Sequence, residues 1–146
     1  MSKTVYVLIG LPRSGKSTWA EQNRDGKFVV SADAFRLALY GDAYNRDKES
    51  QLWACVHACL AALVSEGADV IIDNTNITLK SRRSALEPFV RHGYNVVYVQ
   101  VCTSVEICLS RATQELKSVI DRMSLGFEAL SDDDYPGEVW VVQTEC

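Results

Sequence analysis

The sequence predicts one α/β domain over residues 1–146, in which a parallel sheet of about five strands is covered by helices on both faces. Short apolar runs alternate along the chain with longer segments of helical periodicity, the pattern of repeated βαβ units. The first run, Val5 to Ile9, is apolar throughout, as expected of a strand buried on both faces. With 146 residues, 47% of them hydrophobic, the chain is long enough to form one continuous core.

Two helices and a strand are expected after the first strand. Lys16 to Arg24 is predicted to be helical and to end at the following Asp-Gly turn. Phe28 to Ser31 is a second short apolar run. The next helix starts near Ala34, and either Ser31 or Asp33 can cap it, because both side chains accept hydrogen bonds from backbone N–H groups.

The middle of the chain contains a polar loop and a long amphipathic helix. Tyr40 to Lys48 includes a glycine, an asparagine and four charged residues, and is predicted to be a loop. From Glu49 to Glu66, apolar residues recur every three or four positions, which predicts a helix with one buried face that ends at Gly67. These apolar residues are Leu52, Trp53, Val56, Cys59, Leu60, Leu63 and Val64.

The second half of the chain continues the alternation. Strands are expected at Val70–Ile72, Asn95–Val101 and Val139–Val142, and helices at Leu79–His92, Val105–Leu116 and Val119–Leu130. The segment from Ser131 to Pro136 contains three consecutive aspartates and is predicted to be a solvated turn. Right-handed crossovers between parallel strands complete a three-layer sandwich.

The loop after the first strand carries the most specific phosphate-binding motif of the sequence. Its GLPRSGKS segment matches the P-loop pattern G-x-x-x-x-G-K-[ST] and lies between a buried strand and a helix, which predicts a P-loop NTPase fold. The backbone N–H groups would surround the phosphates of ATP. Lys16 is expected to reach the outer phosphates, and the Ser17 hydroxyl to bind Mg²⁺. The expected nucleotide-binding residues are Gly10, Pro12, Arg13, Ser14, Gly15, Lys16, Ser17 and Thr18.

Two aspartates follow strand ends, and the carboxyl ends of parallel strands face one ligand crevice. Asp33 can accept the proton of an attacking hydroxyl, as phosphoryl transfer requires, or it can simply cap a helix. Asp73 ends the third apolar run and is expected to hold Mg²⁺ or to orient the acceptor. Asn74 and Asn76 add donors and acceptors beside it, although they are equally typical of a plain turn.

Arg36 lies three residues after Asp33, and therefore on the same helical face one turn further on. Its planar fork of N–H donors suits a phosphate group of the acceptor. The alternative interpretation is a solvated surface arginine. The sequence alone leaves both open.

These segments together resemble the kinase domain of the polynucleotide 5′-hydroxyl kinase family, both the phage enzyme and the kinase half of the eukaryotic end-processing kinase/phosphatase. The resemblance rests on Gly10–Ser17, on the SADAFR segment Ser31–Arg36 and on the DNTN segment Asp73–Asn76. It extends over nearly the whole chain, including Arg82 and Arg83 at the start of the fourth helix. The P-loop is common to many kinases, whereas the pair of D-x-x-R and D-N-T-N is much more restrictive.

The resemblance implies roles for individual residues. Lys16 and Ser17 would bind ATP and the metal, Asp33 would be the general base, and Arg36 would contact the acceptor phosphate. The remaining residues implied at the acceptor site are Asp73, Asn74, Asn76 and Arg82.

The family also closes a lid over ATP with an arginine after the fourth strand. Arg111 is the expected lid residue here, although its spacing departs slightly from the family pattern. A fork of donors suits the developing charge of the phosphoryl group better than an ammonium does. The other basic residues nearby are Lys117 and Arg122.

Three classes of acceptor remain open. The first is a 5′-hydroxyl end of DNA or RNA, with DNA the expected partner. The second is the hydroxymethyl group of 5-hydroxymethyluracil in DNA, because standalone phage modules of this kind resemble that activity; such a base would have to be flipped out of a duplex. The third is a small metabolite, or no acceptor at all in a nucleotide switch, although the sequence lacks the N-K-x-D motif of switch GTPases.

Aromatic side chains are candidates for stacking on bases. Trp19 and Trp53 stand among apolar residues of helices, which favours core packing. Tyr40 and Tyr44, in the polar loop, are the better stacking candidates. His57 lies between two cysteines, but residues two apart on a helix point in different directions, so no metal site is expected there.

Composition adds expectations about partners and location. With 15 basic and 19 acidic residues the net charge is −4, so tight non-specific DNA binding is not expected unless basic residues gather on one face. The five cysteines, an odd number without a CxxC pair, are expected to be reduced. No segment resembles a signal peptide or membrane span, which predicts a cytoplasmic protein, in the host cytoplasm if phage-encoded. Oligomers occur in the family, but no sustained apolar stripe requires one.

Overall fold

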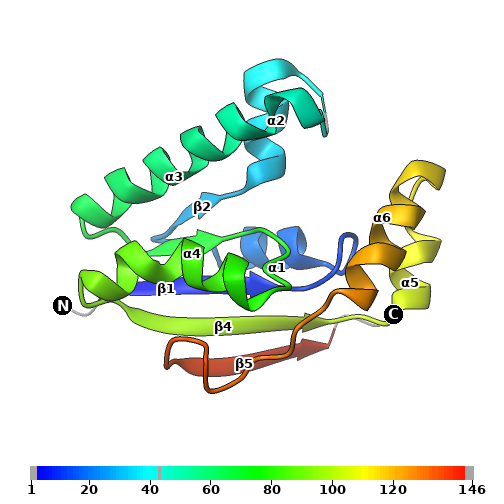
Figure 1. Ribbon diagram of the computed structural model, residues 1–146. Coiled ribbons are helices and arrows are strands. Elements are labelled where there is room, and N and C mark those ends of the chain that lie inside the picture. Colours follow the sequence, from blue (N-terminus) through cyan, green and yellow to red (C-terminus); the bar gives the residue numbers. More distant parts are fainter. Residues whose placement is uncertain (1–2, 43, 144–146) are drawn as a thin grey trace.

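Five parallel strands form one sheet in the order β2-β3-β1-β4-β5 (Figure 1). The computed structural model describes residues 3–42 and 44–143. The predicted α/β class and the number of strands are confirmed. The strands are β1 (Thr4–Ile9), β2 (Phe28–Val30), β3 (Val70–Ile72), β4 (Asn95–Cys102) and β5 (Glu138–Gln143).

Helices cover both faces of this sheet, as predicted. One face packs against α3 and α4 and the other against α1, whereas α5 and α6 stand beyond the carboxyl ends of the strands (Figure 1). The helices are α1 (Lys16–Asn23), α2 (Ala32–Tyr40), α3 (Glu49–Ser65), α4 (Leu79–Arg91), α5 (Val105–Ser110) and α6 (Gln114–Leu125), with a 3₁₀ turn at Arg46–Lys48. No helix in the described part of the chain is both long and apolar enough to cross a membrane.

The central strand β1 supplies both cores because successive side chains of a strand point to opposite faces. Val5 and Val7 are fully buried in the core under α3 and α4. Leu8, equally buried, belongs to the core under α1, where it joins Ala20. This two-sided burial explains why the strand is apolar throughout.

The two late helices differ from the prediction. The chain breaks after Ser110 rather than after Leu116, because Thr113 caps α6 by accepting a hydrogen bond from the backbone N–H of Leu116 at 3.4 Å. The helix predicted to run to Leu130 ends at Leu125. Apolar periodicity continues through these boundaries, so the cap, rather than the pattern, sets where α6 begins.

Ser31, and not Asp33, caps α2. The Ser31 hydroxyl oxygen accepts a hydrogen bond from the Ala34 backbone N–H at 3.2 Å, and the helix begins at Ala32. Asp33 therefore lies in the first turn, with its carboxylate not used for capping. Of the five cysteines expected to be reduced, Cys146 lies outside the described residues, and the four that are described are free, namely Cys55, Cys59, Cys102 and Cys108.

The segment predicted to be a solvated turn contains a buried ion pair. Asp134 is 7% exposed, and its carboxylate lies 2.7 Å from the Nε of Arg82, whose residue is 0% exposed. Arg82 uses all five of its N–H donors: two on Asp134, and the rest on the backbone oxygens of residues 76, 128 and 129. This arginine fastens the chain that returns from α6 to the start of α4.

Candidate active site

The loop between β1 and α1 has the tight curvature that a phosphate-binding loop needs. Arg13 and Gly15 both adopt left-handed backbone angles, with φ of 67° and 108°. A Cβ on Gly10 would stand 2.7 Å from the Ser14 hydroxyl oxygen and 3.1 Å from the carbonyl oxygen of Val101, so this position excludes a side chain. The loop can therefore turn its N–H groups inward at the N-terminus of α1.

Two side chains from the segment after β4 hold the outer edge of this loop. The Thr103 hydroxyl donates to the carbonyl oxygen of Ser14 at 2.7 Å. The Arg111 guanidinium donates to the carbonyl oxygen of Arg13 at 3.1 Å. The structure thus brings Arg111, the expected lid residue, to the P-loop, while Lys117 and Arg122 stand on α6.

Lys16 is largely buried and points along the P-loop. Its ammonium donates to the carbonyl oxygen of Leu11 at 2.8 Å. Burial lowers the pKa of this ammonium below its usual range, while the negative charges of Asp73 and Asp33 oppose the shift. A bound polyphosphate would supply the additional negative charge that this buried cation lacks.

Ser17 and Asp73 form the candidate metal site. The Ser17 hydroxyl donates to a carboxylate oxygen of Asp73 at 2.9 Å. Burial raises the pKa of Asp73, partly offset by the Ser17 hydrogen bond and the charge of Lys16. Mg²⁺ takes one or two protein oxygens together with substrate phosphates, so this hydroxyl–carboxylate pair fits it. Within the described residues no group of three or more His, Cys, Asp or Glu side chains could hold a metal without such phosphates.

The DNTN segment ties the ends of three strands together. The Asp73 backbone N–H donates to the carbonyl oxygen of Val30 at the end of β2, and the Gly10 N–H donates to the carbonyl oxygen of Thr75. The Asn74 side-chain oxygen accepts a hydrogen bond from the Ala32 N–H at 2.9 Å. Asp73 is therefore held between the P-loop and the start of α2.

Asn76 has a structural role in place of the predicted substrate contact. It is 5% exposed, and its backbone is left-handed, with φ of 48°. Its side-chain amide donates to the carbonyl oxygen of Leu8 at 2.9 Å. Asn76 thus fixes the DNTN segment to β1 rather than facing a ligand.

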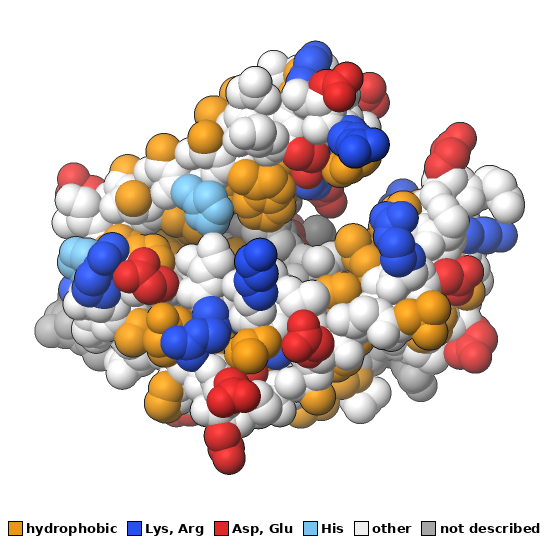
Figure 2. Space-filling model, viewed as in Figure 1, with side chains coloured by type: hydrophobic (Ala, Val, Ile, Leu, Met, Phe, Trp, Pro, Cys, Tyr) orange, Lys and Arg blue, Asp and Glu red, His pale blue; other side chains and the backbone are white. Residues whose placement is uncertain are grey.

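Asp33 presents its carboxylate to solvent beside the P-loop. Its side chain is 86% exposed, and its charge lies near enough to affect the pKa of both Lys16 and Asp73. The surface is hollowed between the α2–α3 side and the α5–α6 side of the molecule (Figure 2). The geometry expected of a general base is thus present: an accessible carboxylate next to the site of the phosphates.

Arg36 is held by two carboxylates. Its Nε and one terminal nitrogen donate to Glu49 at 3.0 and 2.8 Å, and the other terminal nitrogen donates to Asp33 at 2.6 Å. The bonds to Glu49 raise the pKa of Arg36, and the reciprocal hydrogen bonds lower the pKa of Glu49. Sequence reasoning missed Glu49, because its partner lies 13 residues away across a loop and no local motif marks the pair.

Arg82 does not reach the site. Its guanidinium is enclosed by Asp134 and by backbone oxygens, with no exposed surface for a substrate. The expected role in substrate binding is therefore replaced by a structural one. An arginine in the first turn of a helix gives no local sign of which role it has, so the sequence could not separate the two roles.

Sequence reasoning also missed a cavity of about 420 Å³ beside the start of the P-loop. Its walls come from the ends of β1 and β4 and from the segments around α5 and α6, so no single stretch of sequence reveals it. The lining residues are Ile9, Gly10, Leu11, Gln100, Val101, Cys102, Thr103, Ser104, Val105, Ser124 and Phe127.

Curated proteins similar to this chain include two kinds of enzyme. The chain is 32% identical over 111 residues to a 2′,3′-cyclic-nucleotide 3′-phosphodiesterase of Pongo abelii, a match that covers 70% of the chain and 25% of that protein. It is 37% identical over 79 residues to a bifunctional polynucleotide phosphatase/kinase of Schizosaccharomyces pombe, covering 54% of the chain and 16% of that protein. The chain thus spans a quarter or less of the length of these relatives.

Solved structures share the fold. A chain of the Pnkp1/Rnl/Hen1 RNA repair complex matches with a TM-score of 0.71 at 25% identity, covering 85% of this chain and 43% of that chain. The APS kinase of Mycobacterium tuberculosis matches with a TM-score of 0.65 at 18% identity, covering 99% and 90%, which is a likeness of fold alone.

A family model described as an AAA domain matches residues 5–131, most of the described chain. This match, the kinase-like P-loop fold and the polynucleotide kinase relatives confirm the resemblance to the polynucleotide kinase family drawn from the motifs. The chain belongs to this AAA-domain family of P-loop proteins.

Proposed function

We propose that this protein is an ATP-dependent kinase that transfers the γ-phosphate to a hydroxyl group of a nucleic acid, with a 5′-hydroxyl end of DNA or RNA as the first candidate. The observation that carries the proposal is the exposed carboxylate of Asp33 beside the P-loop. It lies near Lys16 and Asp73, which supports a role as the base for an acceptor placed opposite the phosphates.

The P-loop and its two partners would bind the nucleotide. Backbone N–H groups and Lys16 hold the β- and γ-phosphates, and Ser17 with Asp73 would hold Mg²⁺. The metal, when bound, supplies charge neutralisation at the phosphate oxygens. Arg111 lies at the P-loop edge, where its guanidinium can turn from the Arg13 carbonyl toward the transferring group.

Asp33 would carry the proton transfer. The acceptor hydroxyl gives its proton to the Asp33 carboxylate while its oxygen forms a bond to the γ-phosphorus. The bond from that phosphorus to the β–γ bridging oxygen breaks, and ADP leaves with the electron pair. Lys16 remains charged throughout and stabilises the oxygens of the transferred group.

Arg36 would position the acceptor. Three of its five N–H donors are used by Glu49 and Asp33, which leaves one on each terminal nitrogen for a phosphate next to the acceptor hydroxyl. The paired carboxylates keep the guanidinium in place. Support for a nucleic-acid acceptor comes from similarity to the phosphatase/kinase of Schizosaccharomyces pombe, whose name states its polynucleotide substrate.

A second candidate function is nucleotide binding in a protein whose chemistry lies in another domain. The match to the phosphodiesterase of Pongo abelii favours it, because this chain corresponds to only 25% of that protein. In that case the P-loop would bind nucleotide, and Asp33 would have no acceptor to deprotonate.

Transfer of radiolabel from γ-labelled ATP separates these functions. The acceptors are a 5′-hydroxyl oligonucleotide as DNA and as RNA, a 5′-phosphorylated DNA that contains 5-hydroxymethyluracil, and a mixture of nucleosides and sugars. Label in the 5′-hydroxyl oligonucleotides alone is the expected result, and the Lys16→Ala variant should show none. Label confined to the modified base would move the acceptor to the second class, and label confined to the mixture would refute both nucleic-acid assignments. ATP binding without any transfer would favour the second candidate function.

A further inference from the structure

Three residues of α3 form a row that leads away from the acceptor side of the site. Glu49, Trp53 and His57 are spaced by four, so their side chains share one helical face, one turn apart. We call these three residues the α3 row. Its first member touches the proposed site directly, since Glu49 holds Arg36, which in turn contacts Asp33.

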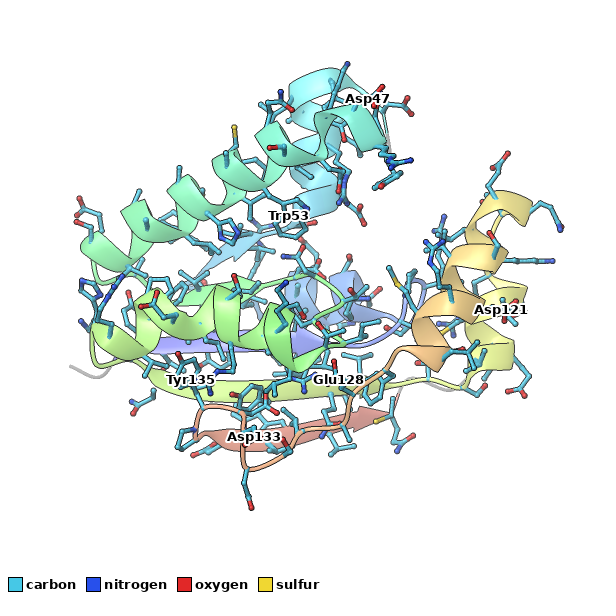
Figure 3. All side chains as sticks on the ribbon, in the orientation of Figure 1. Asp47, Trp53, Asp121, Glu128, Asp133 and Tyr135 are labelled. Carbon is cyan, nitrogen blue, oxygen red and sulfur yellow. The ribbon has the colours of Figure 1, made fainter. Side chains whose placement is uncertain are left out.

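Neighbouring members of the α3 row are in contact. Trp53 lies close enough to the Glu49 carboxylate to contribute, after Arg36, to lowering the Glu49 pKa. The rings of Trp53 and His57 lie with centroids 6.0 Å apart and planes inclined at 38°. Trp53 projects from α3 toward α4 (Figure 3). A continuous chain of side chains thus runs from the proposed base, Asp33, to the imidazole.

The two rings differ in how much of their surface is free. Trp53 is partly buried and packs against the core under α3, as the sequence predicted. His57 is exposed, although it stands on the same face of the helix. The exposed His57 ring extends the aromatic surface that begins at Trp53, and a flat ligand can stack on it.

The facing helix, α4, carries an exposed basic side chain in its first turn. Lys80 is exposed in the first turn of α4, and Figure 2 shows basic side chains opposite the histidine and the apolar surface of α3. Arg83, also on α4, is held on the other side of that helix, because its guanidinium lies over the Tyr135 ring at 4.4 Å and donates to the carbonyl oxygen of Asp133, both on the β5 side of α4 (Figure 3). Aromatic rings on one side and cations on the other match the base and the phosphate of a single strand.

We propose that Trp53 and His57 form a stacking platform for the nucleotides that follow the reacting end of a single-stranded acceptor, while Lys80 of α4 meets their phosphates. This inference rests on the proposed function, because Asp33 must receive the 5′ end. The nine residues from Glu49 to His57, eight helical steps, span about 12 Å of helix, the length of about three stacked bases. Stacking on rings is tolerant of base identity, so the platform predicts little sequence preference.

His57→Ala is the cleanest test, because His57 is exposed and contributes little to the core. With a short 5′-hydroxyl oligonucleotide, the variant should raise the KM for the acceptor about fivefold or more, with the KM for ATP and the turnover unchanged. Trp53→Leu should act in the same direction, and Trp53→Phe should retain most of the affinity because it keeps a ring. Thermal unfolding of each variant separates loss of packing from loss of stacking.

An acceptor without bases at its second and third nucleotides identifies the contact. Wild type should bind this abasic acceptor more weakly, by about the same factor that His57→Ala causes with the intact one. The variant should then bind the two acceptors alike, because both changes remove one interaction. Trp140→Ala is the matched aromatic control, since Trp140 packs with Tyr6 and Trp19 on the opposite face of the sheet.

Fluorescence anisotropy of a labelled 5′-hydroxyl oligonucleotide, without ATP, measures the platform independently of catalysis. If wild type binds the oligonucleotide but does not phosphorylate it, the proposed function is wrong. The platform is then tested by how strongly the His57 and Trp53 variants bind the same oligonucleotide. The platform is refuted if His57→Ala and Trp53→Leu bind intact and abasic strands as wild type does, or if wild type binds neither.

Discussion

Two arginines of this protein make almost the same contacts with opposite consequences. Arg82 and Arg36 each form a bidentate pair with one carboxylate, Asp134 in the first case and Glu49 in the second. Arg82 is fully enclosed and uses every donor it has. Arg36 stands at the edge of the site, and its third carboxylate contact is a side chain that is 86% exposed.

The difference lies in what surrounds each pair rather than in the pair itself. A buried ion pair whose remaining donors all meet backbone oxygens holds segments of the chain together. A pair that leaves donors unused can hold a ligand. Unused donors therefore distinguish Arg36 from Arg82 in this fold, and residue type does not.

The largest effect on turnover is expected from a change of Asp33, the exposed carboxylate that contacts Arg36. Asp33→Asn should lower turnover by about 10²–10⁴-fold, because an amide cannot accept the proton of the acceptor hydroxyl. Its thermal stability and affinity for ATP should stay near wild type, since the Asp33 side chain is mostly in solvent. Steady-state kinetics and calorimetric ATP binding measure both; turnover within tenfold of wild type would remove Asp33 as the base.

The matched change at the buried pair of Arg82 and Asp134 should reduce the stability of the fold. Arg82→Met should destabilise the fold by about 3–5 kcal/mol, because it leaves the Asp134 carboxylate buried without its partner. Urea unfolding measures the loss. The double change Arg82→Met with Asp134→Leu should recover much of it, whereas equal instability of single and double variants would assign the effect to the lost backbone contacts instead.

Arg36→Lys tests whether the two unused N–H donors of the Arg36 guanidinium bind the acceptor. A lysine keeps the charge but cannot bind Glu49 through two nitrogens and still present two further donors. We expect the KM for a nucleic-acid acceptor to rise about tenfold and stability to change by about 1 kcal/mol. Arg83→Lys is a control on a neighbouring surface, with no contact to Asp33; the same kinetic change in both variants would show a general charge effect.

The smallest effect concerns pH. Hydrogen bonds from Arg36 lower the pKa of Glu49 in the folded protein below the usual value of 4.5. The stability that Glu49 contributes is therefore fully present above about pH 4.5 and is lost as pH falls through the lower folded value. The difference in unfolding free energy between wild type and Glu49→Gln should be constant from pH 7 to pH 5 and shrink below pH 4.5. If this difference in unfolding free energy grew below pH 4.5, the prediction would be wrong.

Local signals predicted most of the fold and the nucleotide half of the site. The apolar run of β1, the glycines of the P-loop and the strand-end positions of Asp33 and Asp73 act within a few residues of sequence, so they could be read directly. The exact start of α6 could not, because the Thr113 cap competes with a periodicity that runs through it.

The interior contacts between distant segments could not be predicted from the sequence. Arg82 and Asp134 are 52 residues apart, and nothing near either one indicates that both are buried. The string of aspartates that ends with Asp134 is typical of a solvated turn, and two of its three members are exposed. Only the fold shows which one turns inward.

The enclosure of Arg82 also bears on how this protein can change through evolution. Its guanidinium binds main-chain oxygens at residues 76, 128 and 129, so the side chains of residues 128 and 129 are left free to drift. Positions 82 and 134 are bound to each other by charge and should be exchanged together or not at all. Lineages that lose the arginine while keeping the aspartate would be at odds with this arrangement.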